Sequence, residues 1–163
     1  MSSVEKIAKK IGYVRESIFG GLWSFESNED KADSAYTQEE LRPHTDSTYS
    51  NDAPGLQLLL CCHYKAFGGE SIMVDGFKIA EKIKNEKKEI YDLLTQIEVT
   101  GQYIGDGVFL KAKRPIFRVN SDSELIQVSF NNYDRAPFKF SEDKTKKFYE
   151  AIKEFDLIAN NKD

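Results

Sequence analysis

One stretch of this sequence indicates both its fold and its chemistry. It reads Arg42-Pro43-His44-Thr45-Asp46-Ser47-Thr48-Tyr49. Side chains two residues apart lie on the same side of an extended backbone, so His44 and Asp46 can reach one metal ion. A His-x-Asp pair supplies two of the three ligands of the 2-His-1-carboxylate triad, which holds non-haem Fe(II). Because such pairs also occur by chance, a surface hydrogen bond between the two side chains is the alternative interpretation.

Composition indicates one folded, soluble domain. The 163 residues are 40% hydrophobic and 31% charged, which is enough apolar sequence to form a core. The net charge of -4 gives no electrostatic basis for binding nucleic acid or an anionic membrane. No stretch is long and apolar enough to span a bilayer, and the sequence opens with no secretory signal. We therefore expect a soluble, intracellular protein.

Helices are predicted from apolar periodicity and from capping residues. Residues 4–11 suit a short helix, and Asp75 can cap a helix that continues to residue 97. Ser141 can cap a final helix in which apolar residues recur at helical spacing. The run Thr37-x-x-Glu40 matches a capping box, which predicts one helical turn just before the His-x-Asp pair.

Strands are predicted where short apolar runs lie between turn signals. The runs are residues 56–64, 71–74, 115–119 and 125–130. The first is continuously apolar, which favours a strand buried on both faces. We expect its adjacent cysteines, Cys61 and Cys62, to be buried thiols, and His63 to be a hydrogen-bonded core or edge residue. Several strands with helices packed outside predict an α+β fold dominated by a sheet.

Five runs of the sequence together resemble one enzyme family. They are Phe19-Gly20-Gly21-Leu22-Trp23, Ala35-Tyr36-Thr37, the stretch from Arg42-Pro43-His44-Thr45-Asp46 to Pro54-Gly55-Leu56-Gln57-Leu58-Leu59, the stretch from Gly68-Gly69-Glu70-Ser71 to Val74-Asp75-Gly76-Phe77, and Phe130-Asn131-Asn132-Tyr133-Asp134-Arg135-Ala136. In order and spacing they resemble the Fe(II)/2-oxoglutarate oxygenases of carnitine biosynthesis, the trimethyllysine and γ-butyrobetaine dioxygenases, within the taurine-dioxygenase-like superfamily. The fold implied is a double-stranded β-helix, a relative of the jelly roll, with a helical insertion after Gly76.

The resemblance implies an iron site and a cosubstrate site. His44 and Asp46 match the first two iron ligands of the family. Ser71 and Leu59 match positions beside 2-oxoglutarate, with the Ser71 hydroxyl against its carboxylate. The resemblance thus implies two cofactors, Fe(II) and 2-oxoglutarate, and it assigns no catalytic residue beyond these ligands.

The resemblance also implies a substrate with a trimethylammonium group. Trp23 and Tyr36 match aromatic positions that enclose this group, and Phe19 lies where a further ring of the cage is expected. A quaternary ammonium cannot donate a hydrogen bond, so a cation–π cage suits it. Ordinary core packing is the alternative for Phe19. Asp33 suits the α-ammonium of trimethyllysine, and Asn132 resembles the family's strand beside the substrate.

One part of the family's pattern is missing from this sequence. The triad needs a second histidine, and the family follows that histidine with an arginine that pairs with 2-oxoglutarate. The sequence holds only His44 and His63. We therefore expect residues 1–163 to be a partial oxygenase catalytic domain without its C-terminal strands, unable to catalyse turnover alone.

The leading prediction is Fe(II)- and 2-oxoglutarate-dependent hydroxylation of a small trimethylammonium substrate, N6-trimethyllysine, in carnitine biosynthesis. The first alternative is the same chemistry on γ-butyrobetaine or another quaternary amine. The second is a non-catalytic module or pseudoenzyme that keeps the aromatic cage. We expect no nucleic-acid or membrane partner, a cytoplasmic location (mitochondrial in a eukaryote), and homodimerisation through unpaired strand edges.

Overall fold

The computed structural model describes residues 3–26, 39–65, 67–105 and 107–161. The chain divides into two compact units. The first is formed by residues 1–40 and 54–70, and the second by residues 41–53 and 71–163. The predicted helical turn at Thr37 and two predicted substrate residues, Asp33 and Tyr36, lie outside the described residues. Whether residues 1–163 act as one domain stays a prediction.

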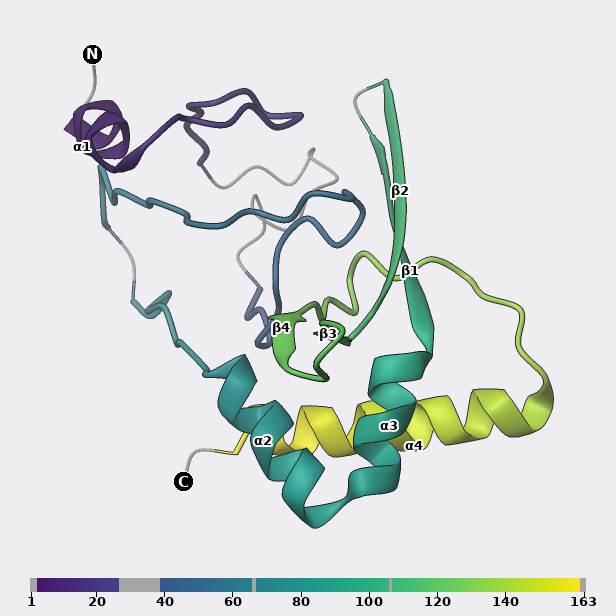
Figure 1. The fold of residues 1–163 in the computed structure, drawn as a ribbon. Helices are drawn as coiled ribbons and strands as arrows, with labels where there is room; N and C mark the ends of the chain where they lie inside the picture. Colours follow the sequence, from purple (N-terminus) through teal and green to yellow (C-terminus); the bar gives the residue numbers. More distant parts are fainter. Residues whose placement is uncertain (1–2, 27–38, 66, 106, 162–163) are drawn as a thin grey trace. The chain divides into compact units, whose positions relative to one another are not determined.

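The second unit contains the hydrophobic core. Figure 1 shows α2 (Gly76–Glu86), α3 (Lys88–Gln96) and α4 (Glu142–Ala159) packed beside the short sheet of β3 (Phe117–Val119) and β4 (Leu125–Val128). Phe117 is fully buried, and its ring lies 5.4 Å from that of Tyr91 and 5.9 Å from that of Phe155. Helices and antiparallel strands therefore share one core, as predicted, although helices hold more of the described residues than strands do.

The predicted helix caps are confirmed. The Asp75 carboxylate accepts hydrogen bonds from the backbone N–H groups of Phe77 and Lys78, at 2.9 and 3.0 Å. The Ser141 hydroxyl accepts one from the N–H of Lys144 and begins α4. The single helix predicted over residues 76–97 is wrong in one respect. It breaks at Lys87, whose φ of -143° is not helical and whose ammonium forms an ion pair with Glu154 of α4.

A hairpin that we did not predict lies between α3 and β3. Its strands are β1 (Glu98–Gly105) and β2 (Val108–Pro115), which pair antiparallel along their whole length. Residues 134–136 lie along the other edge of β1, where Asp134 accepts from the N–H of Gln102 and Ala136 donates to Thr100. The sequence signal was the Asp106-Gly107 pair, a typical hairpin turn.

Two of the four predicted strands are confirmed, and two are wrong. Residues 115–119 and 125–130 contain β3 and β4. Residues 56–64 and 71–74 form no strand, and their side chains are exposed. Cys61, Cys62 and His63 are therefore exposed rather than buried. An isolated apolar strand is not stable without a partner strand, and among the described residues none pairs with these runs.

The first unit contains little regular structure among its described residues. It has α1 (Ser3–Ile11), as predicted, and a tight turn in which Ser17 and Gly20 exchange backbone hydrogen bonds of 3.1 and 3.0 Å. None of its described side chains is buried. Over the described ranges of the whole chain, we find no helix of the length and apolarity needed to cross a membrane.

Candidate metal centre

The His-x-Asp pair lies on an irregular segment, residues 41–53, that is bound to the second unit through Thr45. The N–H of Thr45 donates to the backbone carbonyl of Phe130 at 2.7 Å. The N–H of Phe130 donates in return to the Thr45 hydroxyl at 2.9 Å. Thr45 is thus joined to residue 130 by its backbone and its side chain, between the two residues predicted to bind metal.

A second attachment lies at Thr48, where the segment contacts β1 at Gly101. A Cβ atom on Gly101 would lie 2.5 Å from the carbonyl carbon and oxygen of Thr48, so only glycine permits this approach. The carbonyl of Thr48 accepts from Arg114 of β2 at 3.5 Å. Thr48 and Tyr49 are buried as a result. The segment is therefore held between His44 and Asp46, at Thr45, and again just after the pair, at Thr48.

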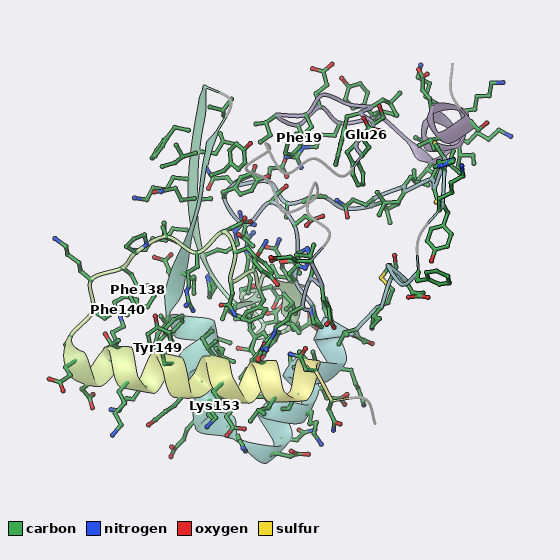
Figure 2. All side chains as sticks on the ribbon, turned by 180° about the vertical axis from the view of Figure 1, so that it is seen from behind. Phe19, Glu26, Phe138, Phe140, Tyr149 and Lys153 are labelled. Atoms are coloured by element: carbon green, nitrogen blue, oxygen red, sulfur yellow. The ribbon has the colours of Figure 1, made fainter. Side chains whose placement is uncertain are left out.

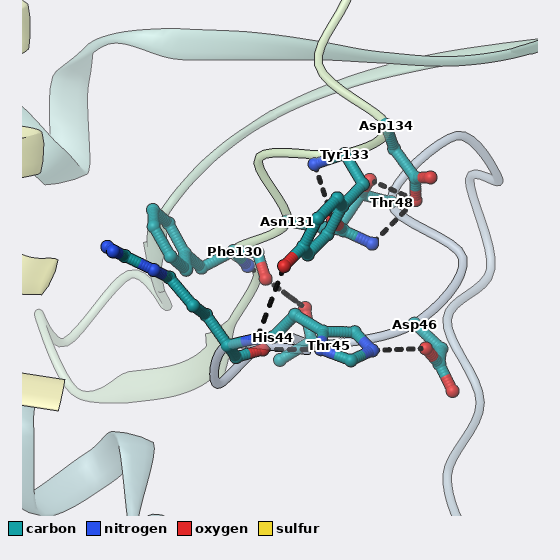
Figure 3. Close-up of polar contacts among 9 residues, drawn as sticks. His44, Thr45, Asp46, Thr48, Phe130, Asn131, Tyr133 and Asp134 are labelled. Atoms are coloured by element: carbon teal, nitrogen blue, oxygen red, sulfur yellow. Dashed lines mark hydrogen bonds and ion pairs between the residues drawn. The ribbon is translucent and has the colours of Figure 1, made fainter. Parts of the chain in front are cut away.

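His44 and Asp46 point toward each other, as the spacing predicted (Figure 3). His44 Nε2 lies 3.3 Å from Asp46 Oδ1, and His44 Nδ1 lies 2.7 Å from the carbonyl oxygen of Arg42. A carbonyl oxygen can only accept, so Nδ1 carries the hydrogen. In the neutral ring the lone pair then lies on Nε2, beside the carboxylate. A backbone carbonyl that orients the ring in this way is typical of metal-binding histidines.

The surroundings of His44 favour its protonated form when no metal is present. The hydrogen bond to Asp46 is the main cause that raises the pKa of His44. Partial burial opposes it, while the Arg42 carbonyl and the negative charges of Asp46 and Asp134 also raise the pKa. Since a metal needs the neutral imidazole, metal and proton compete for Nε2.

Side chains from residues 130–134 surround the pair. The edge of the His44 ring faces Tyr133, with ring centres 6.0 Å apart. The hydroxyl of Tyr133 accepts from the backbone N–H of Arg42 at 3.2 Å. The Asp134 carboxylate accepts from Thr48 and from Asn131, each at 3.0 Å (Figure 3). The run that contains Asn132, predicted to lie beside the substrate, thus supports the metal-binding segment.

The donor pair suits Fe(II). Imidazole nitrogen and carboxylate oxygen are the donor types of non-haem iron sites. Two ligand atoms bound to one ion at right angles, with bonds of about 2.0–2.2 Å, lie about 3 Å apart, close to the 3.3 Å observed. Among the residues that the structure describes, no group of three or more His, Cys, Asp or Glu side chains is placed to hold a metal. The described part of the centre is a two-ligand site.

The other predicted site residues are distributed over both units. Ser71 belongs to the same unit as His44, and its side chain is exposed. Leu59, Phe19 and Trp23 belong to the other unit, where Leu59 is exposed.

The predicted cage residues Phe19 and Trp23 do lie in contact, with ring centres 5.1 Å apart. Sequence reasoning missed a third ring, Phe25, whose centre lies 4.7 Å from that of Trp23. Phe19 is labelled in Figure 2. The spacing of two residues between Trp23 and Phe25 was the available signal.

Comparison with known proteins places the chain in one class. The family described as "Taurine catabolism dioxygenase TauD, TfdA family" matches residues 1–163. The chain therefore belongs to the TauD/TfdA dioxygenase family.

Within this family, the relatives share the names suggested by the resemblance. Trimethyllysine dioxygenase of Meyerozyma guilliermondii is 38% identical over 162 residues, which cover 96% of this chain and 41% of that protein. Human mitochondrial trimethyllysine dioxygenase is 34% identical over 81% of this chain and 32% of its own length. Human gamma-butyrobetaine dioxygenase is 29% identical over 98% of this chain and 42% of its own length. The chain spans about two fifths or less of the curated relatives it matches.

Proposed function

We propose that His44 and Asp46 are two iron ligands of a Fe(II)- and 2-oxoglutarate-dependent oxygenase that hydroxylates a small trimethylammonium substrate. The observation that supports this most directly is the approach of His44 Nε2 to Asp46 Oδ1, at 3.3 Å, on an anchored segment. The substrate we favour is N6-trimethyllysine, because a relative named for it is more similar to this chain than the relative named for γ-butyrobetaine. The fold we propose for the whole catalytic domain is a double-stranded β-helix.

In this proposal, each residue of the segment has a separate role. His44 Nε2 and Asp46 Oδ1 bind the metal, and the Arg42 carbonyl orients the imidazole through Nδ1. Thr45 holds the backbone between the two ligands in place. Bound Fe(II) with 2-oxoglutarate supplies the activation of dioxygen for C–H hydroxylation. Ser71 and Leu59 contribute to the 2-oxoglutarate site.

The proposed substrate site uses aromatic rings to bind the trimethylammonium group. Trp23, Tyr36 and Phe19 form the cation–π cage, which holds one C–H bond of the substrate near the metal. Asp33 pairs with the α-ammonium of trimethyllysine, and Asn132 contacts the substrate. Asp33→Asn should therefore shift binding from trimethyllysine toward γ-butyrobetaine, which has no α-ammonium.

We propose that the third iron ligand of the triad is a histidine other than His63. His63 is the only other histidine of the sequence. With two ligands alone, we expect weak iron binding and no turnover by this chain. We also propose a cytoplasmic location (mitochondrial in a eukaryote) and homodimerisation, the latter through the exposed apolar run at residues 56–64.

The test is an anaerobic Fe(II) titration in the presence of 2-oxoglutarate, following the metal-to-ligand charge-transfer band. His44→Ala removes a proposed direct ligand, so it should weaken iron binding by at least the roughly 10–100-fold that loss of an outer-shell partner costs. His63→Ala is the matched control, because it removes the other histidine of the sequence. It should leave iron binding unchanged, and a loss equal to that of His44→Ala would assign the third ligand to His63. Equal affinity of the unmodified chain and His44→Ala would contradict the proposal.

A second candidate function is a non-catalytic module that binds quaternary ammonium compounds. It is favoured by the contact of Phe19, Trp23 and Phe25 and by the two-ligand metal site of the described residues. Calorimetry with trimethyllysine separates the two candidates. Binding that is lost in Trp23→Ala but needs no Fe(II), together with no iron binding at His44, would favour the module over the oxygenase.

A further inference from the structure

A small cavity lies inside the second unit, beside the segment that carries the metal-binding pair. Its volume is about 20 Å³, which is room for one water-sized particle and too little for a carboxylate or phosphate group. The polar side chains on its wall belong to Thr48, Thr100, Arg114, Ser129, Asn131, Asn132 and Arg135. Two of them are arginines, and none of the lining residues is acidic.

Arg135 on this wall has a buried donor that is not satisfied. Its Nη1 is the buried side-chain nitrogen for which the described part of the chain provides no hydrogen-bond partner. The guanidinium lies against the rings of Phe138, Phe148 and Tyr149, at 6.0, 5.8 and 5.2 Å from their centres. Phe138 and Tyr149 are labelled in Figure 2. Arginine cannot lose its charge in a protein, so a buried donor without an acceptor is costly.

The second arginine adds to the positive charge around the cavity. Arg114 donates to the Thr48 carbonyl, and burial together with the nearby charge of Arg118 lowers its pKa. Two carboxylates partly offset these charges. The negative charge of Asp52 raises the pKa of Arg114, against the two lowering effects. The Asp134 carboxylate accepts hydrogen bonds from Thr48 and Asn131. Neither carboxylate lines the cavity itself.

We propose that this cavity binds one monoatomic anion of the size of chloride, with Arg135 Nη1 as a donor and Arg114 as the second positive charge. Arginine side chains only donate hydrogen bonds, and the serine hydroxyl and the asparagine amides of the wall can also donate. The hydroxyls and amides of the wall can donate or accept, but its two guanidinium groups only donate, and no lining carboxylate balances their charge. An anion therefore fits this wall better than a neutral water molecule. The cavity shares Asn132 with the proposed substrate site, but the anion proposal rests on Arg135 and Arg114, which have no role in the function proposed above.

The first test measures unfolding of the full chain by urea at constant ionic strength, with sodium chloride replaced stepwise by sodium gluconate. Chloride at about ten times its dissociation constant should lower the unfolding equilibrium constant about tenfold, and each further tenfold rise in chloride should lower it about tenfold more. Arg135→Met should abolish this chloride dependence. Lys111→Met, which removes an exposed positive charge from β2, should keep it. Equal stability in chloride and gluconate would overturn the proposal, and so would a dependence that survives Arg135→Met.

A second test does not need a variant that folds. A crystal of the unmodified chain grown in sodium bromide should show an anomalous peak in the cavity, within hydrogen-bond distance of Arg135 Nη1. A water molecule there, or an empty cavity, would overturn the proposal.

Discussion

Two neighbouring stretches of this chain differ in burial. From composition alone the apolar stretch would be expected inside and the polar stretch outside, but the structure shows the opposite. Residues 56–64 are almost continuously apolar, yet all their side chains are exposed. Residues 41–53 are mostly polar, yet Thr48 and Tyr49 are buried and Thr45 is hydrogen-bonded to Phe130. Burial here depends on whether a complementary surface exists within the described residues, and the polar stretch has one where the apolar stretch does not.

The same contrast separates the two parts of the proposed site. His44 and Asp46 lie in the unit with a hydrophobic core, whereas Phe19 and Trp23 lie in a unit without a buried side chain among its described residues. We therefore expect the metal pair to be preorganised and the aromatic rings to become ordered on binding. Four measurements test whether the two units differ in this way.

The largest expected effect is on the free energy of unfolding, when the core of the second unit loses the ring of Phe117. Phe117→Ala should lower the free energy of unfolding by about 3–5 kcal/mol, because it removes a fully buried ring. Phe67→Ala, which removes a fully exposed ring from the other unit, should change it by less than about 0.5 kcal/mol. Urea denaturation followed by far-ultraviolet circular dichroism measures both. Similar losses in the two variants would contradict the assignment of the core.

The next effect concerns the attachment of the segment to β1. Gly101→Ala should cost about 1–3 kcal/mol, because its Cβ would overlap the backbone of Thr48. Hydrogen exchange of the Thr45 amide should become faster in this variant. Gly55→Ala, at a glycine whose added Cβ would meet no atom within 4 Å, is the control and should leave that amide unchanged. An unchanged Thr45 amide in Gly101→Ala would show that the two attachments are independent.

A smaller effect is expected from the Thr45 hydroxyl. Thr45→Val keeps the shape of the side chain but leaves the Phe130 N–H without its acceptor, at a cost of about 1 kcal/mol. Because the change lies between the two metal ligands, Fe(II) affinity should also fall. Ser50→Ala, which removes an exposed hydroxyl from the same segment, should change neither quantity. Weaker iron binding in both variants would argue against a specific role for Thr45.

The smallest effect is the dependence of stability on pH. The pKa of His44 is raised by Asp46, so the folded chain binds this proton more tightly than the unfolded chain. The stabilisation is complete below the unfolded pKa of about 6.5 and is lost as pH rises through the raised folded pKa. Nuclear magnetic resonance titration of the His44 ring in metal-free protein measures it. Asp46→Asn should lower the pKa of His44, and an unchanged pKa would contradict the 3.3 Å contact.

Several features of the candidate site were predictable, since they depend on residues close together in the sequence. The approach of His44 to Asp46 follows from the two-residue period of extended backbone, and Asp75 and Ser141 cap helices as predicted. The break at Lys87 was not predictable, because neither glycine nor proline marks it. It allows α2 and α3 each to pack against α4. The β1–β2 hairpin was predictable, because the Asp106-Gly107 pair in the sequence is a typical hairpin signal.

The family, the approach of His44 to Asp46 and the helix caps at Asp75 and Ser141 could be predicted from the sequence, because they depend on local motifs and on hydrogen bonds over a few residues. Three features became visible only in the folded structure. They are the close contact of Gly101 with Thr48, the exposure of residues 56–64, and the buried Arg135 Nη1, which has no hydrogen-bond partner among the described residues. These features depend on distant segments meeting at atomic distances. A local pattern of residue types does not specify which distant backbone atoms will meet, so it could not predict them.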